Sequence, residues 1–170
     1  MPHPGATIPT MQRGTAIRAV KTVVILDSEF NSTNAMQAVL DRRGFVVLRA
    51  GTADEAIKLL KNAGTSVDLM ILEVPLSGST SQTESAVQIS GAFPEIPILL
   101  VSDLALDKWP ADDFLRFGEL LSGRIDLLVK PLAQASFMSK ANALIYTISY
   151  GESRRLFDRS VIRREEAARA

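Results

Sequence analysis

Five short apolar runs recur along the chain, and a segment with helical spacing follows each of them. The runs cover residues 21–27, 45–50, 67–72, 96–102 and 124–129. They are rich in aliphatic and β-branched side chains, as expected for strands that are buried on both faces of a sheet. Strands that alternate with helices form a mostly parallel sheet with helices on both faces. The alternation therefore predicts an α/β domain built on a five-stranded parallel sheet.

The helical segments carry start and stop signals. A first helix is expected from an N-cap among residues 31–33 to about residue 43, where Gly44 ends it. Thr52 and Glu55 form a capping box for the second helix. Further helices are predicted over residues 84–90, 107–123 and 134–150, and the polar stretch 77–84 is predicted to be a loop. Trp109 is interpreted as a core or loop anchor in preference to a binding platform.

Length and charge restrict the organisation and the partners. The 170 residues suit one domain with a tail, and 19 basic against 19 acidic residues favour neither nucleic acid nor an anionic membrane as a partner. The absence of cysteine excludes thiolate metal sites and is compatible with a cytoplasmic location. No apolar run is long enough to span a bilayer, so no membrane association is expected. The predicted organisation is a flexible leader over 1–19, a domain over 20–150 and a charged helical extension over 151–170.

Polar residues stand where the predicted strands end. In parallel α/β sheets, ligands bind beyond the carboxyl ends of the strands. A cluster of acids, one hydroxyl and one lysine at this edge can hold a divalent cation and an oxyanion. The candidates are Asp27, Ser28 and Glu29 after the first run, Glu73 after the third, Ser102 and Asp103 at the fourth, and Lys130 after the fifth.

The segments VVILDSE, DLMILEVP, PILLVSD and DLLVKPL, taken in this order, resemble the receiver domain of two-component response regulators. The resemblance covers roughly residues 20–148. It implies a flavodoxin-like, doubly wound fold with strand order 2-1-3-4-5 and helices on both faces, here followed by an extra C-terminal helix. It also implies a role in two-component signal transduction or a phosphorelay.

The resemblance assigns a role to each strand-end position. Asp27 and Ser28 occupy the places of two acids that hold Mg²⁺, and Glu29 that of the acid that often follows. Glu73 occupies the phospho-acceptor position, which is normally Asp. Ser102 matches the hydroxyl that meets the phosphoryl group. The remaining matches are Lys130, which contacts the phosphoryl oxygens and precedes Pro131 in an expected cis peptide, and Leu127, which stands where the family has its switch aromatic.

Two of these positions depart from the chemistry that phosphorylation needs. Glu73 is longer than Asp by about 1.3–1.5 Å, and a misplacement of roughly 1 Å can slow an in-line displacement about a hundredfold. Ser28 removes one charge from the metal site, so any Mg²⁺ held by Asp27 and Glu73 is expected to bind weakly. The Glu73 carboxylate is also expected to pair with Lys130 and to accept a hydrogen bond from Ser102, which would weakly imitate a phosphorylated state.

These observations predict a stand-alone pseudo-receiver that is not an enzyme and acts by protein–protein interaction. The expected partner is a histidine kinase or a downstream regulator, with a homodimer left open, and the expected face lies around the fourth and fifth strands and the last domain helix. One alternative is a working receiver with a variant acidic site, and another is an unrelated doubly wound domain that binds a small anionic ligand. The C-terminal extension is either a solvated helix with opposite charges or a partner or dimer helix that extends the last domain helix.

Overall fold

The computed structural model contains a five-stranded parallel sheet with strand order β2-β1-β3-β4-β5, as the resemblance to receiver domains implied. It describes residues 20–27, 33–62, 67–74, 81–120, 124–146 and 152–169. The strands are β1 (Thr22–Leu26), β2 (Val46–Ala50), β3 (Leu69–Val74), β4 (Ile98–Ser102) and β5 (Ile125–Val129). The helices are α1 (Asn34–Arg42), α2 (Ala53–Asn62), α3 (Ser81–Ala92), the 3₁₀ turn η1 (Leu106–Lys108), α4 (Ala111–Glu119), α5 (Gln134–Tyr146) and α6 (Glu152–Arg169).

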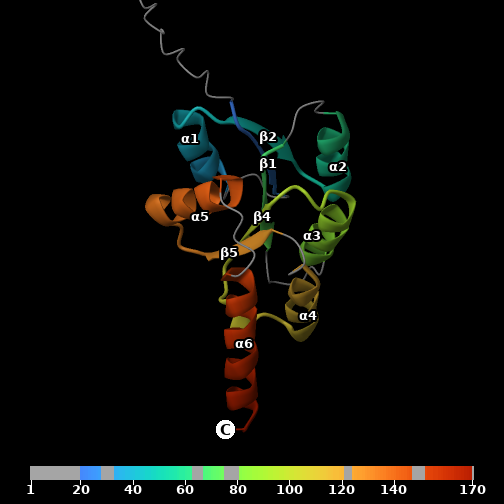
Figure 1. Ribbon diagram of the computed structural model, residues 1–170, viewed down its shortest axis with the longest axis vertical. Coiled ribbons are helices and arrows are strands. Elements are labelled where there is room, and N and C mark those ends of the chain that lie inside the picture. The colour runs from blue at the N-terminus through green and yellow to red at the C-terminus, as the bar shows by residue number, and fades with distance from the viewer. Residues whose placement is uncertain are drawn as a thin grey trace, which may run out of the picture.

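Helices cover both faces of the sheet, so β1, β3 and β4 are buried on both sides, whereas the edge strand β2 is partly exposed. Figure 1 shows α1 and α5 on one side of the sheet and α2, α3 and α4 on the other. Alternate side chains of each strand point to opposite faces, and β3 supplies Met70 and Leu72 to one core and Leu69 and Ile71 to the other. This arrangement explains why the strand sequences are continuously apolar.

The helix ends follow their local signals with two adjustments. Gly44 has φ of 81° and ends α1, as predicted. Thr33 is the N-cap of α1 but makes no side-chain capping bond. Thr52 Oγ1 accepts the Glu55 N–H at 3.2 Å, whereas the Glu55 carboxylate accepts the N–H of Gly51 at 2.8 Å. The Thr52 half of the capping box is therefore standard, whereas the Glu55 carboxylate bonds the N–H one residue before Thr52.

Some predicted boundaries were wrong. The third strand was predicted over 67–72, but β3 is Leu69–Val74, so Glu73 lies inside the strand and not after it. The single helix predicted over 107–123 is divided into η1 and α4, because Pro110 between them cannot donate a helical hydrogen bond. The short helix predicted over 84–90 is the longer α3, whose polar first turn resembled a loop.

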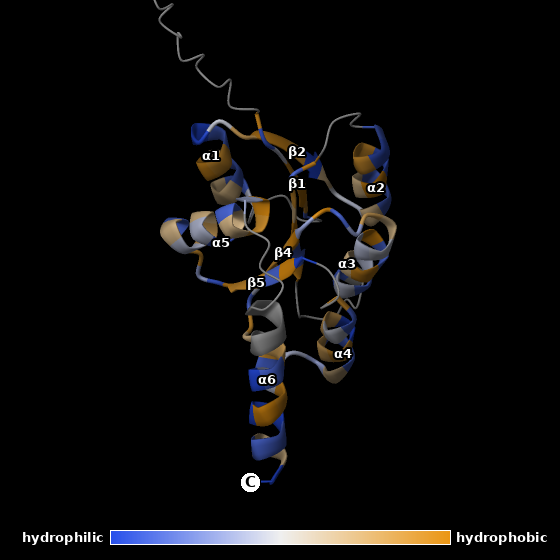
Figure 2. Cartoon of the chain, in the orientation of Figure 1, coloured by the Kyte–Doolittle hydropathy of each residue, from blue (hydrophilic) through white to orange (hydrophobic). Residues whose placement is uncertain are grey.

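The C-terminal helix α6 packs against the domain along one of its faces. It contacts η1 and β5 and runs beside α4 below the sheet (Figure 1). Phe157 and Val161 join the core cluster on the α4 side of the sheet, and Ser160 is buried. Hydrophilic residues predominate along the rest of α6 (Figure 2). The extension was interpreted either as a solvated helix or as a partner or dimer helix. Only the outer face of α6 is solvated, because its other face packs on the domain.

Among the described residues, no helix combines the length and the apolar character needed to cross a bilayer.

Candidate functional site

The polar strand-end residues gather at the carboxyl edge of the sheet. Leu26 of β1 pairs in register with Leu72 of β3, so Asp27 and Glu73 are the next residues on neighbouring strands. Both carboxylates are buried, with 3% and 8% of their residues' surface exposed. Lys130 follows β5, and its backbone N–H donates to Ser102 O at 2.8 Å. The strand order thus brings together residues that are up to about a hundred positions apart in the sequence.

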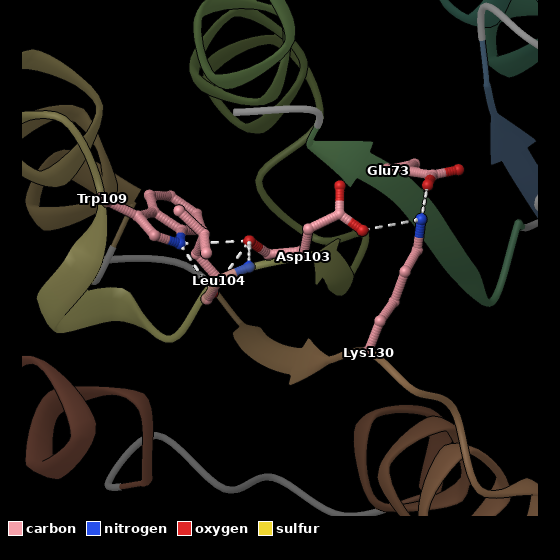
Figure 3. Close-up of polar contacts among 6 residues, drawn as sticks. Glu73, Asp103, Leu104, Trp109 and Lys130 are labelled. Atoms are coloured by element: carbon pink, nitrogen blue, oxygen red, sulfur yellow. Dashed lines mark hydrogen bonds and ion pairs between the residues drawn. The ribbon is translucent and has the colours of Figure 1, made fainter. Parts of the chain in front are cut away.

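Lys130 lies between two carboxylates. Its ammonium forms an ion pair with Glu73 Oε1 and lies 3.3 Å from Asp103 Oδ1 (Figure 3). The Glu73 side chain is 10% exposed and the Asp103 side chain 56% exposed, so the first pair is the better shielded from water. The predicted pairing of Glu73 with Lys130 is confirmed. The peptide bond from Lys130 to Pro131 is cis, also as predicted.

Ser102 faces away from this ion pair. Its neighbours in phase along β4, Ile98 and Leu100, belong to the core on the α2–α4 side of the sheet. Ser102 Oγ donates to Leu104 O at 2.9 Å and accepts the indole N–H of Trp109 at 3.1 Å. The expected hydrogen bond from Ser102 to Glu73 was therefore wrong, because alternation along the strand sends this hydroxyl to the other face.

Asp27 is held by a second polar network. Thr33 Oγ1 donates to Asp27 Oδ2 at 2.8 Å, which explains why this hydroxyl does not cap α1. Arg49 of β2 donates to the same Thr33 oxygen at 2.7 Å and to Asn34 Oδ1 at 2.8 Å. Thr33 is fully buried. The Thr33 hydroxyl therefore links the Arg49 guanidinium to the Asp27 carboxylate.

The other predicted positions fall in two groups. Leu127 is buried in the core beside its β4 partner Leu100, so an aliphatic side chain fills the place of the switch aromatic. Ser28 and Glu29 lie outside the described residues, as does the predicted leader over 1–19.

The resemblance implies Mg²⁺ at Asp27 and Glu73, and the described side chains do not fit that ion. Among them, no three His, Cys, Asp or Glu residues are grouped so that they could hold a metal. Asp27 already accepts the hydroxyl of Thr33, and Glu73 is paired with Lys130. Mg²⁺ requires near-ideal oxygen geometry and favours carboxylates. Positive side chains of the protein itself compensate the two acids. Lys130 forms an ion pair with Glu73, and Arg49 lies near Asp27.

The contacts that three residues make at this edge of the sheet were not predicted from the sequence. Asp103 was noted only for its position, yet it provides the second carboxylate near Lys130. Arg49 lies within an apolar strand sequence, and no local signal links it to Thr33. Trp109 was expected as an anchor, and its burial at 3% confirms this, but its bond to Ser102 could not be read from spacing.

Comparisons with known proteins agree with this architecture. A response regulator from Thermotoga maritima superposes with a TM-score of 0.59 at 20% identity, over 75% of this chain and 99% of that one. A two-component response regulator from Clostridium difficile gives 0.57 at 22% identity, over 73% and 94% of the two chains. The receiver domain of NtrX from Brucella abortus gives 0.58 at 19% identity, over 74% and 98%.

One curated relative is similar in sequence. The transcriptional regulatory protein AruR of Pseudomonas aeruginosa is 26% identical over 137 residues, which cover 79% of this chain and 53% of that protein. The chain thus matches about half the length of this relative. No family model matches the chain. The strand order, the site geometry and these likenesses together show that the chain has the fold of a response regulator receiver domain.

Proposed function

We propose that this protein is a pseudo-receiver, a signalling module that works by protein–protein interaction and is not phosphorylated in the usual way. The observation that carries the proposal is the ion pair between Glu73, at the phospho-acceptor position, and Lys130. In this proposal the module is not an enzyme and works in the cytoplasm. Its partner is a protein, either a histidine kinase or a downstream regulator, and a second copy of the chain is a further candidate.

The geometry favours a permanently compensated site over a reactive one. A nucleophilic carboxylate has to reach a donor in line and at a fixed distance, and Glu73 carries an extra methylene. Its carboxylate is already engaged by Lys130, the cation that in receivers would bind the incoming phosphoryl group. On the Asp27 side, Thr33 and Arg49 supply a hydrogen bond and a nearby positive charge. Asp27 and Glu73 therefore each have a hydrogen-bond or ion-pair partner without phosphate or metal.

In this proposal, the surface open to a partner is narrower than the face expected from sequence. The expected face lay around β4, β5 and the last domain helix, but α6 packs against β5 and η1 and covers part of it. The division into a leader over 1–19, a domain over 20–150 and an extension over 151–170 stays part of the proposal. In the proposed arrangement, α5 and the outer face of α6 remain open to a partner.

Intact-mass measurement after incubation with acetyl phosphate and Mg²⁺ tests the proposal. We expect no phosphoryl adduct on the wild-type chain and an adduct on the double variant Glu73→Asp, Ser28→Asp, which restores both family acids. A matched Glu73→Gln variant shows whether any adduct depends on this position. An adduct on the wild-type chain that disappears in Glu73→Gln would overturn the proposal.

That outcome would favour a working receiver with a variant site. The specific observation behind this second candidate is that an acid, a lysine and a cis proline occupy the same strand ends as in the family, with the lysine already directed at the acid. The same measurement therefore decides between the two functions.

A further inference from the structure

A pocket with a volume of about 270 Å³ lies between α1 and the start of α5. These two helices contact each other on one side of the sheet (Figure 1). Among the described residues, its lining includes neither Glu73 nor Lys130, so the pocket is separate from the strand-end site. A cavity of about 150 Å³ holds a molecule of the size of benzene, so this pocket has room for about ten non-hydrogen atoms.

The body of the pocket is apolar. Met36, Val39 and Phe137 line it and belong to the core on the α1–α5 side of the sheet, with 2%, 8% and 1% of their surface exposed. Leu132, which precedes α5, packs against the same core. Ala38 is an exposed lining residue with a small side chain. Walls of this kind bind the hydrocarbon part of a ligand.

The C-terminal end of α1 adds a cation to the pocket. Ala35, Ala38 and Arg42 all line it, and their spacing places them on one face of the helix, over a length of roughly 10 Å. Arg42 Nε donates to Ala38 O at 3.0 Å, and the other N–H donors of this guanidinium have no acceptor among the described residues. The described lining contains no acid, and its other polar residue, Gln134, is neutral. The charge of the pocket therefore complements an anion.

We propose that this pocket binds a small aliphatic monocarboxylate of about eight carbons, whose carboxylate pairs with Arg42 and whose chain lies between α1 and α5. A guanidinium matches the two oxygens of a carboxylate in a bidentate arrangement. One cation suits a ligand with one negative charge better than a phosphate group, which carries up to two. The inference goes beyond the proposed function and does not depend on it, because it concerns a different set of residues.

NMR titration of the full chain with octanoate tests the proposal, because octanoate has the expected size and charge. We expect the methyl signals of Met36 and Leu132 to shift saturably, with a Kd of roughly 0.1–1 mM for so small a ligand. Octylamine has the same chain and the opposite charge. It should bind at least about fivefold more weakly, because the Arg42 guanidinium repels it.

Three variants separate the contribution of the charge from that of the space. Arg42→Gln should weaken octanoate binding about three- to fivefold, the scale of an exposed ion pair. Arg43→Gln removes a charge at the next exposed position, which is not among the lining residues, and should leave the Kd unchanged. Ala38→Leu fills part of the pocket with a good helix former at an exposed position, and should weaken binding about tenfold.

Several results would overturn the proposal. One is the absence of any saturable methyl shift with millimolar octanoate. Another is octanoate binding that is undiminished in Ala38→Leu, or octylamine binding that equals it, because the chain would then interact with apolar surface in general. Methyl signals of Met36 and Leu132 that change when the protein alone is diluted would assign the groove to a second copy of the chain instead.

Far-UV circular dichroism of each variant identifies any general loss of fold, and Arg43→Gln controls for the change in net charge. A phosphoryl adduct on wild-type Glu73 would sink the proposed function and leave the octanoate titration unchanged. A failed titration would in turn leave the phosphorylation result unchanged, so the two failures are distinguishable.

Discussion

Glu73 and Lys130 are 57 positions apart in the sequence and form an ion pair at the carboxyl edge of the sheet. The pairing follows from the strand order, because β4 separates β3 from β5 and only long side chains at the strand ends reach across it. Glutamate reaches further than aspartate. The extra methylene that disfavours phosphoryl transfer thus helps to bring the carboxylate to the lysine.

Removal of the lysine tests this pair energetically. Lys130→Met leaves the buried Glu73 carboxylate without its cation, which should lower the free energy of unfolding by about 1–3 kcal/mol. Adding Glu73→Gln should recover part of that loss, because the uncompensated charge is gone. Urea unfolding measures both changes, with Lys61→Met on the exposed side of α2 as control. A loss no larger than that of Lys61→Met would contradict the prediction, because the pair would then add no net stability.

Metal addition tests the internal compensation of the two acids. We expect millimolar Mg²⁺ to leave the Tm of the wild-type chain unchanged, because Thr33 holds Asp27 and Lys130 holds Glu73. The double variant Ser28→Asp, Glu73→Asp should gain stability, by about 1.4 kcal/mol when Mg²⁺ is at ten times its Kd. A wild-type Tm that rises with Mg²⁺ but not with added NaCl of equal ionic strength would contradict this account.

A separate ion pair at the opposite end of β1 predicts a pH dependence. Lys21 Nζ lies 2.8 Å from Asp68 Oδ1, and its hydrogen bond to that carboxylate raises the pKa of Lys21 above its ordinary value of 10.5. When folding raises the pKa of a lysine, the charged lysine stabilises the fold. This stabilisation is fully present at pH values below the pKa of the unfolded state, and it disappears as the pH rises through the pKa of the folded state. Wild type should therefore exceed Lys21→Met in stability at neutral pH and lose that advantage above pH 10.5. Urea unfolding of both proteins across this range is the check, and a constant difference would count against the pair.

Two helical glycines provide a matched test of the α6 packing. A Cβ at Gly91 in α3 meets nothing within 4 Å, whereas one at Gly118 in α4 meets the Phe157 ring at 3.1 Å. Gly91→Ala should stabilise the protein by up to about 0.5–1 kcal/mol, because alanine loses less backbone entropy in a helix. Gly118→Ala should gain less or lose stability, since the ring has to move. Equal gains in urea unfolding would indicate that Phe157 does not lie on α4.

The sheet and the central ion pair were predictable because their signals are local or belong to recurring motifs. Apolar runs gave the strands, and the residues that follow them gave Glu73 and Lys130. The orientation of Ser102 was missed because it depends on which face of the sheet the last residue of β4 points to. The contact of Arg49 with Thr33 joins β2 to α1, and nothing in either segment indicates it.

The docking of α6 was only partly visible in the sequence. Phe157 and Val161 are four residues apart, which indicates one apolar face. The charged residues around them, however, favoured the interpretation as a solvated helix. Arg164 contributes to the packed face through its ring contact with Phe114, and a charge pattern cannot reveal such a role. The tertiary surface of α4 and η1 decides which side of α6 is buried.

In the proposed function, Glu73 takes the acceptor position without accepting a phosphoryl group. Mass spectrometry of the wild-type chain, treated with acetyl phosphate and Mg²⁺ and compared with the Glu73→Asp, Ser28→Asp variant, tests it most directly. We expect an unchanged mass for the wild type and a phosphoryl adduct on the variant, in the peptide that contains position 73. A wild-type adduct in that peptide, absent from Glu73→Gln, would contradict it.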